Sequence, residues 1–515
     1  MPRISCLFLL ALAAPAAADV RLSKMFSDHM VLQRDKPVPV WGWAEAGEEV
    51  TVSFAGQNVA TKADAGGAWQ VKLAPLKTSQ EPQVLSATGK NTVKVADVLV
   101  GEVWLCSGQS NMGMTVGGTT DGDLEGLTAP RLGKLRLITV GTPGSQEPVK
   151  EPDQTWVTCT PDTIRNFSAV GFYFGRQLLD TLDIPIGLIN NAWGGSACEA
   201  WIRRDLFDGK EIYAPLVERW KKMEAEYDFA KEMAKFKAAV EAWKKQSDEA
   251  KAAGKQPPPH PHAPQDLMKG NQRLANLYHG RLKPVMPYAI RGAIWYQGET
   301  NAGRAYQYRE MFPLMIQNWR DDWGQGDFPF YWVQLADFKA EATAPGDADW
   351  AELREAQTMT MSKLPHTGEA VIIDVGEAND IHPRHKLEAG RRLARWALAR
   401  DYAVPVAHHS PTYESMEKQG GKIIVSFKDA DGLRSHDVNE VRGFAIAGDD
   451  KAWKWASAKI IAPNKVEVSS PDVPHPAAVR YGWADNPVCN LYSKSGLPVT
   501  PFRTDDWPGV TANNR

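Results

Sequence analysis

The spacing of hydrophobic residues divides the chain into three regions. Between residues 19 and 97, apolar side chains alternate with polar ones in short runs separated by turns that contain Gly or Asp. The clearest runs are Val38–Trp43, Val50–Phe54 and Trp69–Leu73. Alternation with a period of two is typical of strands that bury one face. The pattern predicts a small β domain over residues 19–97.

From residue 98 to residue 403, longer apolar runs alternate with segments of helical spacing. Strands are expected at Val98–Cys106, Leu135–Val140, Ile186–Asn190, Ile290–Trp295, Phe330–Leu335 and Ala370–Asp374. Helices are expected near Val170–Leu182, Ala305–Trp319, Ala351–Lys363 and Leu387–Arg400. This alternation predicts an α/β domain over residues 98–403, with a parallel sheet covered by helices on both faces.

An insertion and a second β region complete the pattern. Residues 211–265 carry apolar side chains at helical spacing among many Lys and Glu, which predicts an amphipathic helix or a helical hairpin. The prolines of residues 255–264 exclude regular structure, so His260 and His262 are interpreted as solvated rather than as a metal pair. Strands return at Lys422–Phe427, Gly443–Ala447, Ala458–Ile461 and Lys465–Val468. They predict a second β domain and closing segment over residues 404–515.

Composition and charge narrow the class of protein. The 515 residues are 43% hydrophobic and 23% charged, with a net charge of −3 and no long basic block. This is a globular composition, and nucleic acid is not an expected partner. The 19 Trp and 13 Tyr are interpreted first as core packing, with stacking on sugar rings as the functional alternative. The sequence leaves the oligomeric state undetermined.

The first 18 residues predict export from the cytoplasm. Met1–Ala18 has one cation, an apolar centre and small residues before Asp19, which is the pattern of a cleavable signal peptide. Its apolar stretch is too short to span a membrane and no other long apolar run follows, so a periplasmic or secreted protein without membrane association is expected. The four remaining Cys permit disulfides but match no zinc site.

Polar residues follow four of the expected central strands. Ser110 follows the first, Gly194 and Gly195 the third, Gln297 the fourth and His382 the last. Because the carboxyl ends of parallel strands meet at one edge of a sheet, these loops are expected to converge. Acyl transfer needs a nucleophile, a base and hydrogen-bond donors for the oxyanion. Ser110 is the candidate nucleophile and His382 the base, with the two glycine amides and Gln297 as the oxyanion donors.

Two features separate this arrangement from the commoner α/β-hydrolase plan. A nucleophile elbow has Gly on both sides of its Ser, whereas Ser110 is followed by Asn111 and Met112. The candidate acid, Asp380, lies beside His382 in the sequence rather than on a distant loop. Both residues therefore belong to one short turn before a predicted helix.

Several motifs together resemble a known family. They are Gly108–Met112 (GQSNM), Trp295–Glu299 (WYQGE), Asp380–Pro383 (DIHP), Met30–Arg34 and Gly496–Asp505. Across nearly the whole mature chain they are similar to the bacterial sialate O-acetylesterase group of SGNH hydrolases. The resemblance implies an SGNH-type three-layer α/β/α central domain flanked by N- and C-terminal β-sandwich-like domains. It also implies hydrolysis of acetyl esters on sugars without a metal or other cofactor, with Ser110 as nucleophile, His382 as base and Gln297 as an oxyanion donor.

The acid of the expected triad departs from the family pattern. The wider superfamily places its Asp three residues before the histidine, and here that position is Asn379. Asp380, two residues before His382, is the preferred acid, and Asp374 at the end of the expected strand is the alternative. A Ser–His pair supported by a backbone carbonyl is the third possibility.

Four further residues are candidate substrate ligands. Asn111, Glu299, Asn301 and Arg304 lie in the same motifs or next to them. Glu299 is also interpreted as a structural or orienting group, because the role of base already has a histidine. A sialic acid would call for a cation near its carboxylate, and Arg304 or Arg503 could supply it or could hold a structural ion pair.

The function that these residues predict is carbohydrate O-acetylesterase, acting on an O-acetylated sugar or glycan through a serine acyl-enzyme. The alternative within this class is an esterase of acetylated polysaccharide such as xylan or xyloglucan. An alternative from another class is a non-catalytic glycan-binding protein built from the two β domains. The presence of Ser110, Gln297 and His382 together argues against a decayed catalytic centre.

Overall fold

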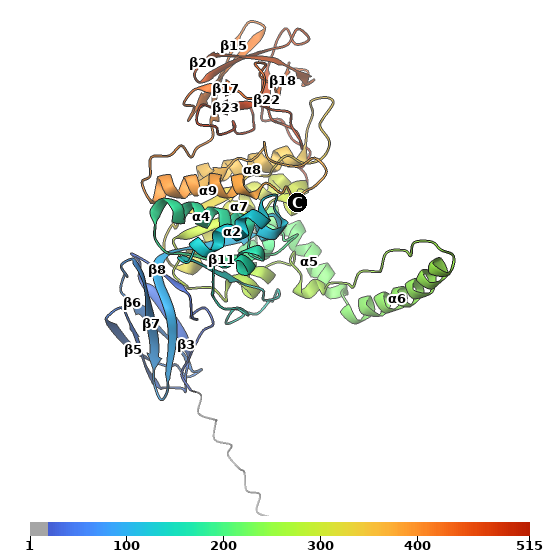
Figure 1. The fold of residues 1–515 in the computed structure, drawn as a ribbon. Helices are drawn as coiled ribbons and strands as arrows, with labels where there is room; N and C mark the ends of the chain where they lie inside the picture. The colour runs from blue at the N-terminus through green and yellow to red at the C-terminus, as the bar shows by residue number, and fades with distance from the viewer. Residues whose placement is uncertain (1–18) are drawn as a thin grey trace, which may run out of the picture.

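The computed structural model describes residues 19–515, and the predicted signal peptide lies outside the described residues. Three units are stacked one above another (Figure 1). A β domain at the N-terminus lies at one end, an α/β domain forms the middle, and a second β domain lies at the other end. This order agrees with the three regions of the hydrophobic pattern.

Two sheets form the N-terminal domain. The first contains β1 (Arg21–Leu22), β3 (Val38–Trp43) and β6 (Ala68–Leu73). The second contains β2 (Val31–Gln33), β4 (Glu49–Phe54), β5 (Gln57–Lys62), β7 (Ser79–Thr88) and the first half of β8 (Thr92–Gly108). Buried and exposed residues alternate strictly along β6, as the sequence predicted. The inner faces of both sheets contribute to one core, so the predicted sandwich-like domain is present.

The strand β8 belongs to two domains at once. Its first half pairs with β7, and its second half pairs with β11 (Ile186–Ala192) and β12 (Gly292–Tyr296) of the central sheet. The domain boundary expected between residues 97 and 98 therefore falls inside one unbroken strand rather than in a linker. The N-terminal domain is therefore joined to the central sheet through a shared strand.

The central sheet has the strand order β10-β9-β11-β8-β12-β13-β14. The strands not yet introduced are β9 (Leu135–Thr139), β10 (Val157–Thr158), β13 (Phe330–Val333) and β14 (Thr367–Ala370). All neighbouring pairs are parallel except β10 with β9. The last strand of the sheet was expected at Ala370–Asp374, but β14 ends at Ala370, about one strand length earlier in the chain. The apolar residues of the expected strand are buried beyond the sheet edge, where Ile373 lies beside Gly482 of the C-terminal domain.

Helices cover both faces of this sheet. One face carries α4 (Ala169–Leu182) and α9 (Lys386–Asp401), and the other carries α7 (Ala305–Trp323) and α8 (Asp349–Lys363). Along β8, Trp104 and Cys106 pack into the core of the first face. Val103 and Leu105 pack into the core of the second. The strand is buried on both sides, as a parallel sheet in a three-layer α/β/α domain requires. Shorter helices are α1 (Ser110–Gly113), α2 (Gly122–Thr128) and α3 (Pro161–Arg165).

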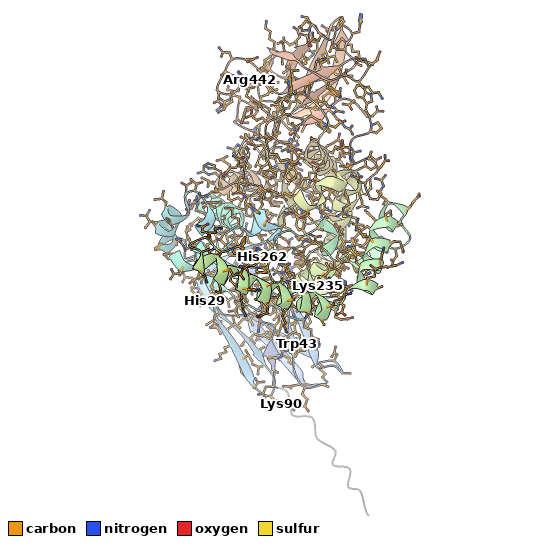
Figure 2. All side chains as sticks on the ribbon, turned by 90° about the vertical axis from the view of Figure 1, so that its right-hand side faces the viewer. His29, Trp43, Lys90, Lys235, His262 and Arg442 are labelled. Carbon is orange, nitrogen blue, oxygen red and sulfur yellow. The ribbon has the colours of Figure 1, made fainter. Side chains whose placement is uncertain are left out.

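The predicted insertion forms an arm that projects from the central domain. It consists of α5 (Ala214–Glu226), the long helix α6 (Phe229–Ala252) and a proline-rich return segment (Figure 1). The apolar face of α6 is covered by that segment: the Trp243 indole donates to the Pro258 carbonyl at 2.7 Å, and the His260 ring lies 4.4 Å from the Trp243 ring. Figure 2 shows Lys235 and His262 together on this arm.

The C-terminal β domain packs on α8. Its strands are β15 (Thr412–Gln419), β16 (Lys422–Lys428), β17 (Leu433–Ser435), β18 (Phe444–Ala447), β19 (Lys454–Trp455), β20 (Ser457–Ala462), β21 (Lys465–Ser469), β22 (Ala478–Tyr481), β23 (Leu491–Ser493) and β24 (Phe502–Arg503). Two four-stranded sheets enclose a separate core. The fully buried guanidinium of Arg354 on α8 donates to the carbonyls of Ala484 and Asp485, which ties this domain to the central one.

Candidate active site

The carboxyl ends of three neighbouring strands meet at one edge of the central sheet. Gly108 at the end of β8 pairs with Ala192 of β11 on one side and with Tyr296 of β12 on the other. The φ angle of Gly108 is +139°, and a Cβ there would lie 2.2 Å from the Tyr296 carbonyl oxygen. Only glycine fits this turn, which brings the next residues over the sheet edge. Ser110 then begins the short helix α1.

The predicted nucleophile and base are brought together. The Nε2 atom of His382, on the loop between β14 and α9, lies 2.8 Å from the Ser110 hydroxyl oxygen. The side chain of His382 is 43% exposed, so the pair opens to solvent. A second serine of this strand end, Ser107, is buried and donates its hydroxyl proton to the Asn191 carbonyl at 2.7 Å. Ser107 therefore joins β8 to β11 and does not face the histidine.

Of the two candidate acids, only Asp380 contacts the histidine. Its Oδ1 atom accepts the backbone N–H of His382 at 2.8 Å and lies 3.6 Å from the ring Nδ1. That second distance is too long for a hydrogen bond, although it is close enough for one to form with a small side-chain rotation. The Asp374 carboxylate instead makes a bidentate ion pair with Arg392 at 2.6 and 2.8 Å and accepts the Tyr492 hydroxyl proton at 3.0 Å.

The two predicted glycines lie beside the nucleophile. A Cβ on Gly194 would come within 3.4 Å of the Ser110 Cβ. Among the described residues, neither Gly194 nor Gly195 has a hydrogen-bond acceptor for its backbone N–H. The carbonyls of this turn are held by the side chains of Asn271 and Gln272, which follow the proline-rich segment. Both glycines therefore lie at the strand end where their place after the third expected strand predicted them.

The structure does not place the Gln297 amide as predicted. The side chain is fully buried, and its Nε2 group donates to the Ser196 carbonyl at 3.1 Å and to the Asn301 side-chain oxygen at 2.6 Å. Its Oε1 atom accepts the Tyr308 hydroxyl proton at 2.9 Å. Both amide hydrogens are therefore used inside the protein. In this arrangement Gln297 supports the loops around the nucleophile and has no hydrogen left for an oxyanion.

The chain matches the model of one protein family over more than half of its length. The model of the family described as carbohydrate esterase, sialic acid-specific acetylesterase matches residues 100–238 and 266–399. The chain belongs to this family. The matched ranges contain Ser110 and His382 and omit the outer part of the arm. The protein is thus a carbohydrate O-acetylesterase by family.

Full-length relatives agree with this assignment. The sialate O-acetylesterase of Mus musculus is 28% identical over 547 residues, which cover 97% of this chain and 97% of the relative. That of Homo sapiens is 27% identical and covers 97% and 95%. A crystal structure of a carbohydrate acetylesterase from Xanthomonas citri is 36% identical, with a TM-score of 0.78, and covers 95% of this chain and 100% of that chain.

Two of the predicted substrate ligands of this carbohydrate esterase are held in an internal network. The Asn301 amide donates to one oxygen of the buried Glu199 carboxylate at 2.8 Å, and Arg304 pairs with the other oxygen at 2.6 Å. Arg503, the second candidate cation for a sugar carboxylate, pairs with Glu355 at 2.7 Å. These predictions of substrate contact are therefore not supported, because each charge or amide is already satisfied within the protein.

The other two predicted ligands, Asn111 and Glu299, also point inward. The Asn111 amide donates to the Glu299 carboxylate at 2.5 Å and to the Ile381 carbonyl at 3.0 Å, and its oxygen accepts a proton from Lys386 at 2.6 Å. Burial raises the pKa of Glu299 above its usual value. Burial lowers the pKa of Lys386 to about 7. Lys386 was not singled out from the sequence, because a lysine at a helix start carries no distinguishing signal.

Metal and membrane sites were also sought in the described part of the chain. No group of three or more His, Cys, Asp or Glu residues is arranged there to hold a metal ion. None of the helices between residues 19 and 515 has the length and apolar character needed to cross a membrane. The four cysteines of this part are free, and three of them are buried.

Proposed function

We propose that this carbohydrate O-acetylesterase works through an acyl-enzyme on Ser110. The observation that carries the proposal is the 2.8 Å contact between the Ser110 hydroxyl oxygen and His382 Nε2 at the carboxyl edge of the sheet. A serine is a weak nucleophile until a base within hydrogen-bond distance takes its proton. The geometry supplies that base. It also leaves the base accessible to the alcohol that must depart and the water that must enter.

The reaction follows from these groups. His382 takes the Ser110 proton while the serine oxygen attacks the acetyl carbonyl carbon. The resulting oxyanion is stabilised by the backbone N–H groups of Ser110 and Gly194, which replace Gln297 in this role. The C–O bond to the sugar then breaks, and the sugar hydroxyl leaves with the proton from His382. Water attacks the acetyl-serine with the histidine again as base, and acetate is released.

The substrate is an O-acetylated sugar or glycan. O-acetylated sialic acid is the first candidate, because the full-length mammalian relatives carry the name sialate O-acetylesterase. The ion pairs of Arg304 and Arg503 support a second candidate, since neither guanidinium is free to bind a sugar carboxylate. That candidate is a neutral acetylated polysaccharide such as xylan or xyloglucan.

Acetate release from matched substrates tests this proposal. The panel contains O-acetylated sialic acid, acetylated xylan and acetylated xyloglucan, each with wild-type protein and with Ser110→Ala as the blank. We expect acetate from at least one sugar and none with the variant. Binding of all three glycans without acetate release would favour the non-catalytic alternative and overturn the proposal.

We also propose that the mature protein acts outside the cytoplasm, in the periplasm or as a secreted enzyme. The proposal rests on the leader pattern of Met1–Ala18. N-terminal sequencing of the protein from a secreting host should begin at Asp19. A product that begins at Met1 and stays with the cytoplasmic fraction would contradict it.

A further inference from the structure

Three different partners fix the orientation of the Asn111 amide. A lysine nitrogen can only donate when charged, and a backbone carbonyl can only accept. The Asn111 oxygen faces the Lys386 nitrogen at 2.6 Å, and its NH2 group faces Glu299 and the Ile381 carbonyl at 2.5 and 3.0 Å. Rotating the amide by 180° would set NH2 against the lysine and oxygen against two acceptors. Lys386, Glu299 and the Ile381 carbonyl together exclude the alternative orientation.

This group of side chains joins the two halves of the catalytic pair. Asn111 follows the nucleophile directly, and Ile381 directly precedes His382. The bond from the Asn111 amide to the Ile381 carbonyl thus connects the helix that begins at Ser110 to the loop that carries the histidine. Asn111 and Lys386 are 2% and 1% exposed, so water does not compete for these bonds.

The surroundings of Lys386 are acidic and aromatic. Its charge interacts with the carboxylates of Glu299, Glu377 and Asp380, and its nitrogen lies 5.3 Å from the centre of the Tyr296 ring. No carboxylate of the described residues forms a salt bridge with it. A buried amino group with one amide as its hydrogen-bond partner costs free energy to fold. The contact between Ser110 and His382, which Lys386 supports through Asn111, would explain why the protein contains this buried amino group.

We propose that Lys386 is a positioning residue that acts through Asn111 to hold the His382 loop at hydrogen-bond distance from Ser110. The inference rests on the proposed roles of Ser110 and His382. When the amide is correctly oriented, it holds the Ile381 carbonyl and so the histidine backbone. When the lysine is lost, the amide loses one of the three partners that fix its orientation, which weakens the Asn111 bond that joins the loop to α1. A displacement of about 1 Å at a reacting pair can cost about 10²-fold in rate.

The chain offers a matched control for this lysine. Lys36 is partly buried, and burial lowers its pKa to about 8. It donates to the carbonyls of Ile290 and Arg291, which precede β12 at the opposite edge of the sheet from Ser110. Lys36→Met removes a partly buried amine together with two hydrogen bonds to backbone carbonyls, where Lys386→Met removes one to a side chain. It leaves the catalytic edge untouched.

The test measures kcat and KM of Lys386→Met and Lys36→Met on a small acetyl ester, with the melting temperature of each. We expect Lys386→Met to lower kcat by about 10- to 100-fold with KM changed less than about threefold, and Lys36→Met to leave kcat unchanged. Equal kcat in both variants would overturn the inference. Activity of Ser110→Ala would contradict the proposed function itself. Failure of the proposed function can therefore be told apart from failure of the inference about Lys386.

A second variant keeps the test informative if Lys386→Met folds poorly. In Lys386→Met/Asn111→Leu both members of the lysine–amide hydrogen bond are replaced by apolar groups, so no unpaired amide oxygen remains, and Asn111→Leu alone is the reference because it too takes the donor from Glu299 and the Ile381 carbonyl. The kcat of the double variant should equal that of Asn111→Leu alone, because the lysine acts through the asparagine. If the loss of kcat in the double variant equalled the product of the two single losses, Lys386 would act independently of Asn111. That result would contradict the inference.

Discussion

Single residues in this active site take their roles from the partners that surround them. Ser107 and Ser110 have the same chemistry, yet one hydroxyl is used to join two strands and the other faces a histidine. Gln297 lies in a highly characteristic motif and Asn301 just after it, but their amides are bound to the protein itself. The sequence therefore predicts that Ser110 and His382 come together, which they do, but it does not predict the partners of the surrounding amides, because those hydrogen bonds depend on loops that are distant in sequence.

The acid assignment can be tested by two substitutions. Asp380→Asn should lower kcat by up to ~10⁴-fold, because a triad carboxylate holds the histidine tautomer and stabilises the imidazolium. Asp374→Asn should instead destabilise the fold by about 3 kcal/mol, since the buried Arg392 guanidinium loses its bidentate carboxylate partner and keeps only the longer contact with Glu388 and the hydrogen bond to the Val371 carbonyl. Steady-state kinetics and urea unfolding of both variants separate the effects. Two small changes in kcat would favour a Ser–His dyad.

Gln297 should prove structural. Gln297→Ala leaves the Ser196 carbonyl and the Tyr308 hydroxyl without this partner, so the free energy of unfolding should fall by about 1–3 kcal/mol or more. At a temperature where the variant is folded, kcat should change by less than about tenfold. A selective loss of about 10²–10³ in kcat, with the melting temperature intact, would return the oxyanion role to this amide.

At the scale of elements, periodicity located most helices and strands within a few residues. The helices α4, α7 and α9 lie within a few residues of their expected ranges because each has an amphipathic pattern. The helix α8 also lies where expected, but it is buried on several sides and has no single apolar face. The expected position of β14 was too late in the chain because the apolar run Val371–Ile373 is buried outside the sheet, with Ile372 in the core of the central domain and Ile373 beside Gly482 of the C-terminal domain. An apolar run in the sequence indicates buried residues. Residues buried at a contact between domains give the same apolar pattern as residues buried in a strand.

The arm should be separable from the catalytic domain. Trp243→Ala removes the contacts that hold the proline-rich segment on α6, so limited proteolysis should cut within residues 229–265 faster than in the wild type. Esterase activity on a small substrate should stay within about twofold, because the family match leaves out residues 239–265. Loss of activity in uncut Trp243→Ala would show instead that the arm contributes to the site.

For the whole molecule, buried carboxyl groups predict how stability depends on pH. Burial raises the pKa of Glu369 to about 7 and that of Asp401 to about 6. A carboxyl group with a higher pKa in the folded state binds its proton more tightly there, so the free energy of unfolding falls as pH rises from the unfolded pKa to the folded pKa. Lys386 has the opposite effect: above pH 7 it makes the free energy of unfolding rise with pH, because its pKa is lower in the folded state than in the unfolded state.

Glu369→Gln should reduce this pH dependence. For Glu369 the decrease should occur between about pH 4.5 and 7 and amount to about 3 kcal/mol, which corresponds to its pKa shift. Urea unfolding at pH 5 and pH 7 gives the change in the free energy of unfolding between these pH values for the wild type and for the variant. The variant should lose less stability between these values than the wild type. Identical losses would mean that Glu369 keeps an ordinary pKa when folded.

The central claim is that Ser110 carries the acetyl group during hydrolysis of acetylated sugars. The most direct measurement is acetate release from an O-acetylated sugar by Ser110→Ala and Ser107→Ala, side by side with the wild type and with folding checked by circular dichroism. The account predicts that Ser110→Ala, although folded, releases no acetate above the uncatalysed rate, while Ser107→Ala stays active. Acetate release by Ser110→Ala near the wild-type rate would contradict it.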